Sequence, residues 1–186
     1  MDRYPRIFAA CRDYFAEASD LRVLSYGCAT GEEVLTLRRY FPGAIIVGAE
    51  INAHCLAVAR KLAVDDRIAF IESDSAAIGS RAPFDVIFCM AVLQRTPMQV
   101  TARGIQDLKG IYPFEKFDAK VTELDSWLKQ GGLLVIHYSQ YAVSRATVGP
   151  NYEPLLTARH IVDDSPKFDR ESRLCADVPN SIWVKQ

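Results

Sequence analysis

The segment most informative about the architecture is residues 22–33, which read R-V-L-S-Y-G-C-A-T-G-E-E. A short apolar strand runs into a turn with Gly27, Ala29 and Gly31 at alternate positions, and a helix is expected to begin near Glu32. Small residues in such a turn let the backbone approach a ligand, and glycine adopts dihedral angles that other residues avoid. The order strand, turn, helix predicts a cofactor pocket at the carboxyl end of a parallel sheet.

Three kinds of cofactor loop compete for this turn. A phosphate-binding P-loop needs Gly-Lys followed by Ser or Thr, and no such sequence follows Gly31. A dinucleotide fingerprint would place its third glycine at position 32, where Glu32 and Glu33 would repel a pyrophosphate from the helix N-terminus. Nicotinamide or flavin binding is therefore disfavoured. A cationic ligand such as S-adenosylmethionine, with its sulfonium and ammonium groups, suits these acids better.

Residues 25–31, S-Y-G-C-A-T-G, resemble the first motif of the class I S-adenosylmethionine-dependent methyltransferases, roughly [DE]-x-G-x-G-x-G. Ser25 replaces the usual acid and Ala29 replaces the middle glycine. Alanine costs little there if its φ is negative. The resemblance implies that the turn, including Gly27, Cys28 and Gly31, holds the cofactor.

Glu50 is the strongest single candidate for a cofactor ligand. It ends the buried strand predicted over residues 44–50 and follows Gly31 by 19 residues. That is close to the spacing of roughly 20 residues at which an acid can accept hydrogen bonds from ribose hydroxyls. The alternative is a solvated acid at a strand end. Ile51 follows it as a further cofactor contact, and Asn52 is expected to cap the next helix.

The third predicted strand, residues 67–73, ends at Asp74 and Ser75. The resemblance implies that this acid and the adjoining backbone hold the adenine. Asp74 could instead cap the following turn, and both interpretations stay open.

The fourth predicted strand, residues 84–90, is a nearly continuous apolar run. By resemblance, its exit at Met90 and Ala91 packs beside the cofactor. Residues 127–139 resemble the family's helix, Gly-Gly stop and fifth strand, and the two glycines suit a helix C-cap.

These cues predict an α/β fold, a single Rossmann-like three-layer sandwich. By resemblance its mostly parallel seven-stranded sheet has one antiparallel strand. The 186 residues suit one methyltransferase domain with a sizeable core. We expect an N-terminal helical cap over residues 1–20, a cofactor-binding core over 21–139, and a substrate loop with terminal strands over 140–186. Two short strands are expected at 173–178 and 181–185, and a short helix at 155–162.

Composition narrows the partners. The net charge is -1 and the basic residues are dispersed, which disfavours nucleic acid. No apolar run has membrane-spanning length and the N-terminus lacks the apolar core of a signal peptide, so we expect a cytoplasmic protein without a membrane partner. The 5 cysteines form no C-x-x-C pair, so neither a disulfide framework nor a metal site is indicated. The expected partner is a small-molecule methyl acceptor. Whether the chain also forms a homodimer is left open.

Methyl transfer from a sulfonium is an in-line displacement that depends mainly on alignment of the acceptor with the methyl carbon. A general base is needed only if the acceptor retains its proton. His137, at the end of the fifth predicted strand, is the candidate. The alternative is a half-buried strand histidine with a satisfied hydrogen bond.

Within the family, the closest local resemblance is to the catalytic domain of the chemotaxis-receptor glutamate methyltransferases, at residues 27–33, 49–52 and 84–89. By position, Glu32 or Glu33 would meet the methionine ammonium. The subgroup's Arg-Asn pair is Met90-Ala91 here. We also expect that the subgroup's separate helical domain does not precede the core.

We therefore expect an S-adenosylmethionine-dependent methyltransferase that acts on an O or N atom of a small molecule and releases S-adenosylhomocysteine. One alternative is a catalytically silent, methyltransferase-like binding module, because a fold does not guarantee chemistry. A protein carboxyl methyltransferase is another, and a nicotinamide reductase is more distant.

Overall fold

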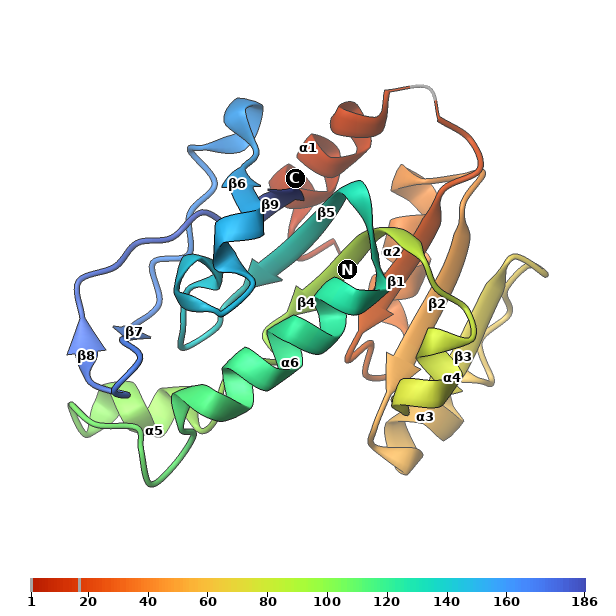
Figure 1. Ribbon diagram of the computed structural model, residues 1–186. Helices are drawn as coiled ribbons and strands as arrows, with labels where there is room; N and C mark the ends of the chain where they lie inside the picture. The colour runs from red at the N-terminus through yellow and green to blue at the C-terminus, as the bar shows by residue number, and fades with distance from the viewer. Residues whose placement is uncertain (1, 17) are drawn as a thin grey trace.

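The structure, a computed structural model, describes residues 2–16 and 18–186. Its centre is a seven-stranded sheet with the order β3-β2-β1-β4-β5-β9-β6 (Figure 1). β3, β2, β1, β4 and β5 pair in parallel, and β9 pairs antiparallel with both β5 and β6. The strands are β1 (Arg22–Tyr26), β2 (Ile45–Glu50), β3 (Ile68–Glu72), β4 (Phe84–Met90), β5 (Leu128–His137), β6 (Tyr152–Pro154) and β9 (Ile182–Lys185). The predicted α/β sandwich with one antiparallel strand is confirmed.

One helix precedes β1, and the others connect the parallel strands. The helices are α1 (Pro5–Phe15), α2 (Glu32–Tyr40), α3 (Ala53–Ala59), α4 (Ser75–Gly79), α5 (Pro97–Ala102) and α6 (Phe114–Trp127). After β5 the chain forms the 3-10 turns η1 (Val143–Arg145), η2 (Gly149–Asn151) and η3 (Leu156–Ala158), and a separate ribbon of β7 (Lys167–Phe168) and β8 (Leu174–Cys175). In the described part of the chain, none of the helices has the length and apolar character needed to cross a membrane.

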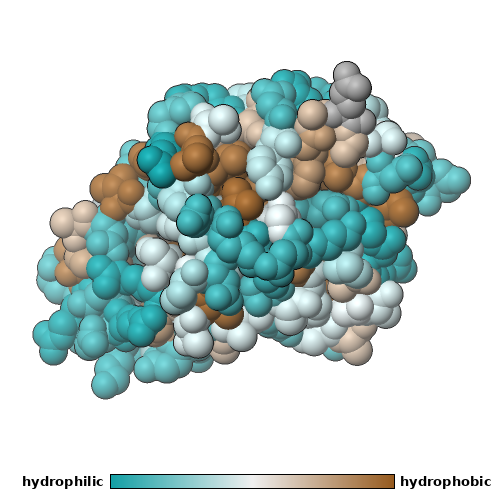
Figure 2. Space-filling view, turned by 45° about the horizontal axis from the view of Figure 1, so that its top comes forward, coloured by the Kyte–Doolittle hydropathy of each residue, from teal (hydrophilic) through white to brown (hydrophobic). Residues whose placement is uncertain are grey.

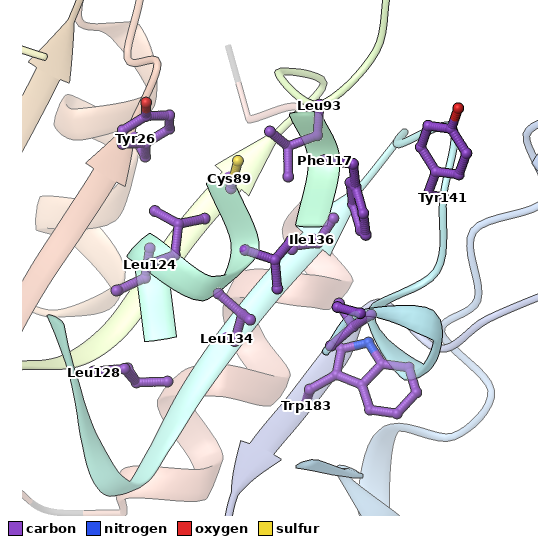
Figure 3. Packing of buried hydrophobic residues seen from close by; sticks show 14 of the residues in the cluster. Tyr26, Cys89, Leu93, Phe117, Leu124, Leu128, Leu134, Ile136, Tyr141 and Trp183 are labelled. Atoms are coloured by element: carbon purple, nitrogen blue, oxygen red, sulfur yellow. The ribbon is translucent and has the colours of Figure 1, made fainter. Parts of the chain in front are cut away.

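Alternate strand residues supply two cores, one on each face of the sheet. On one face, Leu134 and Ile136 of β5 pack beneath Phe117 and Leu124 of α6 (Figure 3). The other face holds strand residues such as Val23 and Val135 together with α1 and α2. Burying each such side chain contributes about 1.5–3 kcal/mol. Most of the large apolar side chains are buried in the two cores. On the face drawn in Figure 2, hydrophobic residues form patches among hydrophilic ones.

The segment after β5 differs from the prediction in two places. The strand expected at residues 173–178 is reduced to β8, which pairs with β7 and not with the main sheet. The sixth strand of the sheet is β6, which has 3 residues, ends at Pro154 and lies at the sheet edge. So short an edge strand has no alternating pattern that a sequence could reveal. The helix expected at 155–162 is only the turn η3, because Val162 forms a β-bridge with Asn180.

The two glycines before the fifth strand also act differently than expected. α6 already ends at Trp127, and Gly131 and Gly132 lie within β5. There the pairing register with β4 shifts between Phe84 and Val86. Gly131 has a φ of 72°, so the expected helix C-cap is wrong and the glycines instead permit a bulge.

Candidate active site

A cavity of about 560 Å³ lies where β1 and β4 end. This volume is in the usual range for small-molecule pockets. Its wall combines the N-terminal segment, the turn after β1, the start of α2 and the exit of β4. The lining residues are Arg3, Tyr4, Phe8, Gly27, Cys28, Ala29, Thr30, Glu32, Glu33, Thr36, Met90, Ala91 and Val92.

The structure brings half of the predicted site residues to this cavity. Those in the lining are Gly27, Cys28, Ala29, Glu32, Met90 and Ala91. In the described ranges, the other predicted residues, Gly31, Glu50, Ile51, Asp74, Ser75 and His137, lie outside the lining.

The turn after β1 needs its glycine. Gly27 has a φ of 77°, and its N–H donates to the Ala49 carbonyl at 2.8 Å. A Cβ on Gly27 would lie 2.5 Å from Cγ2 of Val92. The backbone therefore passes close beneath the exit of β4, which only glycine allows.

Ala29 does not have the negative φ on which its low cost depended. Its φ is 49°, in the left-handed region that alanine avoids. The Ala29 N–H donates to Oε2 of Glu50 at 2.8 Å, and the N–H of Asn52 donates to Oε1 at 2.7 Å. The buried Glu50 carboxylate thus ties the turn to the end of β2 and holds Ala29 in its strained conformation.

Gly31 has a structural role at the start of α2. It is the N-cap residue with a φ of 93°, and a Cβ there would lie 2.6 Å from Cδ1 of Leu62. The side chain next to it, Glu32, is exposed and accepts a hydrogen bond from Thr30 at 2.6 Å, which lowers its pKa. Gly31 therefore places α2 against its neighbours, while Glu32 faces the open side of the cavity.

Glu33 places a carboxylate next to Ser25, the residue that replaces the acid of the sequence motif. The Ser25 hydroxyl donates to Oε1 of Glu33 at 2.7 Å, and Glu33 lines the cavity. Burial raises the pKa of Glu33 to about 7, although the Ser25 hydrogen bond acts in the opposite direction. A cation in the cavity would therefore find an acid that ionises easily near neutral pH.

Cys28 lines the cavity without being reactive. Burial raises the pKa of its thiol to about 12, and the nearby Glu50 and Glu33 charges act in the same direction. The thiol therefore stays protonated, and a thiolate nucleophile is not available here.

The residues expected at the adenine have other contacts in this structure. Oδ1 of Asp74 accepts from the N–H groups of Ala76 and Ala77, so Asp74 caps α4. The Ser75 hydroxyl donates to Glu123 of α6. Ile51 is 80 % exposed. The roles of Asp74 and Ser75 toward adenine, and of Ile51 as a cofactor contact, stay predictions.

His137 is half-buried at the end of β5. Its Nδ1 lies 2.8 Å from the Ser181 hydroxyl oxygen, and burial lowers its pKa. The Tyr4 ring, which lines the cavity, packs edge-on against the imidazole at a centroid distance of 5.5 Å. The site thus matches a strand histidine with a hydrogen-bond partner, and a catalytic role for His137 stays a prediction.

Several lining residues were not singled out as cofactor ligands by the sequence. The sequence could have indicated Phe8, because the amphipathic pattern of α1 turns this side chain inward. Arg3 and Tyr4 precede the helix, and no periodicity or motif marks them. Glu33 was named only as an alternative to Glu32 for the methionine ammonium.

Comparisons with known proteins agree with this geometry. A family described as a methyltransferase domain matches residues 17–177. The structure of the plantazolicin methyltransferase BpumL in complex with SAH is similar with a TM-score of 0.50 and 19% identity, covering 72% of this chain and 46% of BpumL. The bifunctional kinase-methyltransferase WbdD is similar with a TM-score of 0.50 and 20% identity, covering 73% of this chain and 28% of WbdD. No curated protein sequence matches the chain.

Because these two structures share so few identical residues with the chain, their similarity shows the fold alone. The chain spans about half the length of BpumL and just over a quarter of WbdD. Neither is described as a chemotaxis-receptor methyltransferase. The similar structures therefore do not support the local resemblance to that subgroup. The family match covers most of the chain, and the sheet order and the turn after β1 agree with it. The chain therefore belongs to the methyltransferase domain family, within the class I S-adenosylmethionine-dependent methyltransferases.

Proposed function

We propose that the chain transfers the methyl group of S-adenosylmethionine to an O or N atom of a small-molecule acceptor. The observation that carries this proposal is the half-buried Glu33 carboxylate, bonded to Ser25 and facing a cavity of about 560 Å³. An acid at the start of α2 favours a cationic ligand and opposes a pyrophosphate. A small, partly enclosed cavity favours a small acceptor.

The cavity offers partners for the ammonium and carboxylate groups of the methyl donor, and Glu50 and Ile51, outside the lining, offer contacts for its ribose and adenine. Glu33 would accept hydrogen bonds from the methionine ammonium, and Arg3 would pair with its carboxylate, because both side chains line the cavity. Glu50 would receive the ribose hydroxyls with the lone pairs that its two backbone N–H partners leave free. The exposed Ile51 side chain would cover one face of the adenine.

In the transfer step, these residues align the acceptor with the methyl carbon. The donor supplies an activated methyl group when it is bound. The increase in the rate of methyl transfer then comes from holding the reacting atoms in line at near-attack distance. Burial lowers the pKa of His137, which favours the neutral imidazole at pH 7. With its Nδ1–H donating to the Ser181 hydroxyl, Nε2 would take a proton from an acceptor hydroxyl or ammonium.

Ligand-dependent thermal unfolding tests the proposal. At about 100 times its dissociation constant, S-adenosylhomocysteine should stabilise the chain by about 2.7 kcal/mol and raise the unfolding midpoint by roughly 5–10 °C. NADH should leave the midpoint unchanged. A shift with NADH alone, or with neither compound, would refute the proposed cofactor.

A catalytically silent binding module is the second candidate. Ser25 in place of the motif acid and the strained Ala29 are the observations that favour it. Binding of S-adenosylhomocysteine without methyl transfer from labelled S-adenosylmethionine to any acceptor in a broad panel of alcohols, phenols and amines would support this module. Methylation of glutamate side chains in a protein would instead support the carboxyl methyltransferase alternative.

A further inference from the structure

Three aromatic rings stand together beside the cavity, on Tyr4, His137 and Tyr138. We call them the aromatic wall. The ring centroids of Tyr4 and Tyr138 are 6.2 Å apart, and those of Tyr4 and His137 are 5.5 Å apart. The His137 and Tyr138 rings are 4.3 Å apart and tilted by 46°.

The aromatic wall is continuous with the cavity. Tyr4 belongs to the cavity lining, as do Met90 and Ala91 at the exit of β4. Met90 pairs with His137 in the register of β4 and β5, and the Ala91 N–H donates to the His137 carbonyl at 2.8 Å. An acceptor that approaches a methyl group over the β4 exit would therefore lie against these rings.

Tyr138 is held in a conformation that a tyrosine avoids. Its φ is 53°, and its side chain is 40% exposed. A bulky residue in the left-handed region is an outlier that persists only where its surroundings impose it. The ring packs against His137 and Tyr4 and still keeps 40% of the residue exposed, which leaves part of the ring open to a ligand.

A buried ion pair anchors the backbone next to Tyr138. The N–H of the next residue, Ser139, donates to Oδ2 of Asp163 at 2.9 Å. Asp163 is buried and pairs with the fully buried Lys167, with 3.0 Å between Oδ1 and Nζ. The chain after β5 is thus anchored at Ser139, and Tyr138 projects from the anchor.

The ring geometry suits a flat ligand better than a cation. At a separation of 4.3 Å the His137 and Tyr138 rings are in contact, so no ammonium group fits between them. Burial lowers the pKa of His137, which keeps the imidazole uncharged at pH 7. What the aromatic wall offers is a neutral ring face and ring edges, which pack well against another aromatic ring.

We infer that the methyl acceptor is a planar aromatic compound, a phenol or a hydroxyl- or amino-substituted heteroaromatic ring, which stacks against the aromatic wall. This inference rests on the proposed function. A lone pair of the acceptor O or N attacks the methyl carbon as the carbon–sulfur bond breaks, and that bond pair stays on sulfur. The acceptor's proton passes to water or to His137.

Two probe alcohols of similar size test the inference. 2-Naphthol and decahydro-2-naphthol carry the same hydroxyl group, but only the first is planar and aromatic. Each is titrated calorimetrically into protein saturated with S-adenosylhomocysteine, after the heat of S-adenosylhomocysteine binding has been recorded. Two ring contacts should make 2-naphthol bind about fivefold to tenfold more tightly.

Variants separate the aromatic wall from general apolar binding. Tyr138→Leu and, separately, Tyr4→Leu each remove one ring contact and should reduce the preference for 2-naphthol to about twofold to threefold, whereas Tyr138→Phe should keep it. Tyr14→Leu is the matched control, because Tyr14 is 38% exposed, close to the 40% of Tyr138, and its hydroxyl donates to Gly131. This control should keep the full preference.

The outcomes distinguish failure of the aromatic acceptor from failure of the proposed cofactor. Equal binding of the two alcohols, or a preference that survives both leucine variants, overturns the aromatic acceptor while leaving cofactor binding intact. Tighter binding of cyclohexyltrimethylammonium than of 2-naphthol overturns it in favour of a cationic acceptor. Failure of S-adenosylhomocysteine to bind overturns the proposed function, and the inference with it.

Discussion

At the scale of single residues, Ser25 and Glu33 show how a motif can keep its electrostatics while changing its letters. The motif position that normally carries an acid is a serine, but its hydroxyl donates to a carboxylate eight positions further along. The negative charge thus reaches the same cavity from the start of α2 instead of the end of β1. A sequence comparison position by position records only the loss.

The raised pKa of Glu33 predicts a pH-dependent affinity for the cofactor product. Burial favours the neutral acid in the empty site, with a pKa of about 7, while a bound ammonium favours the carboxylate. Below pH 7 binding must therefore release a proton. The affinity for S-adenosylhomocysteine should rise with pH between 5.5 and 7, by at most about tenfold per unit, and level off above 7.

Calorimetric titration at several pH values measures this dependence. Glu33→Gln, which keeps the shape and the hydrogen bond from Ser25, should bind more weakly at pH 7.5 and show a flat profile over the same range. Glu153→Gln is a control, because Glu153 is exposed on β6 and outside the cavity lining. A steep profile that persists in Glu33→Gln would assign the titration to another group.

Ala29 provides a stability prediction with a definite sign. Alanine in the left-handed region costs roughly 1–2 kcal/mol, and glycine there costs little in the folded state. Glycine also loses more chain entropy on folding, which offsets about 0.4–1 kcal/mol. Ala29→Gly should therefore stabilise the chain by about 0.5–1 kcal/mol in urea unfolding.

The opposite substitution in the same turn is the counterpart. Gly27→Ala should destabilise the chain by more than about 1 kcal/mol, because φ is 77° and the new Cβ would lie 2.5 Å from Val92 Cγ2. A loss of stability in Ala29→Gly would contradict the strain assigned to the positive φ of Ala29.

At the scale of elements, the short ribbon after β5 depends on the buried pair of Asp163 and Lys167. Lys167 Nζ also donates to the carbonyl and the hydroxyl of Ser165, so the ammonium group is fully bonded. Burial raises the pKa of Asp163, but the Ser165 hydroxyl and Lys167 outweigh it and keep that pKa below its usual value. Removing one partner leaves an uncompensated buried charge.

Lys167→Met should therefore lower the free energy of unfolding at pH 7 by about 3–5 kcal/mol. Adding Asp163→Asn to Lys167→Met should recover part of this loss, because the unpaired charge is removed. Arg12→Met, which breaks an exposed pair with Asp13, should cost less than about 1 kcal/mol. A double variant no more stable than Lys167→Met alone would contradict the argument from unpaired charge.

The elements also show where sequence patterns are informative. α2 begins at Glu32 and β4 covers Phe84–Met90, both as predicted, because a glycine turn and a long apolar run mark them. β6 and the bulge at Gly131 were missed, because a three-residue edge strand has no period and Gly-Gly suits a helix end and a bulge equally. The cavity lining from Arg3 and Tyr4 depends on long-range packing that no local pattern encodes.

At the scale of the whole molecule, the cavity joins parts of the chain that are distant in sequence. The N-terminal segment contributes Tyr4 and Phe8 to its lining, and the turn after β1 and the exit of β4 contribute the rest of the wall together with the start of α2. Phe8 also packs edge-on against Phe88 of β4, with centroids 5.3 Å apart. A ligand between these parts should therefore couple the opening of α1 to that of the sheet edge.

Amide hydrogen exchange should reveal this coupling. With S-adenosylhomocysteine at about 100 times its dissociation constant, amides that exchange by local opening in residues 6–9, 27–35 and 90–93 should slow by at least about tenfold. Amides of the β7–β8 ribbon, which lies outside the cavity lining, should keep their local exchange rates. Slowing confined to 27–35 would mean that α1 does not close over the ligand. Equal slowing in the ribbon would mean that the ligand acts only by stabilising the fold as a whole.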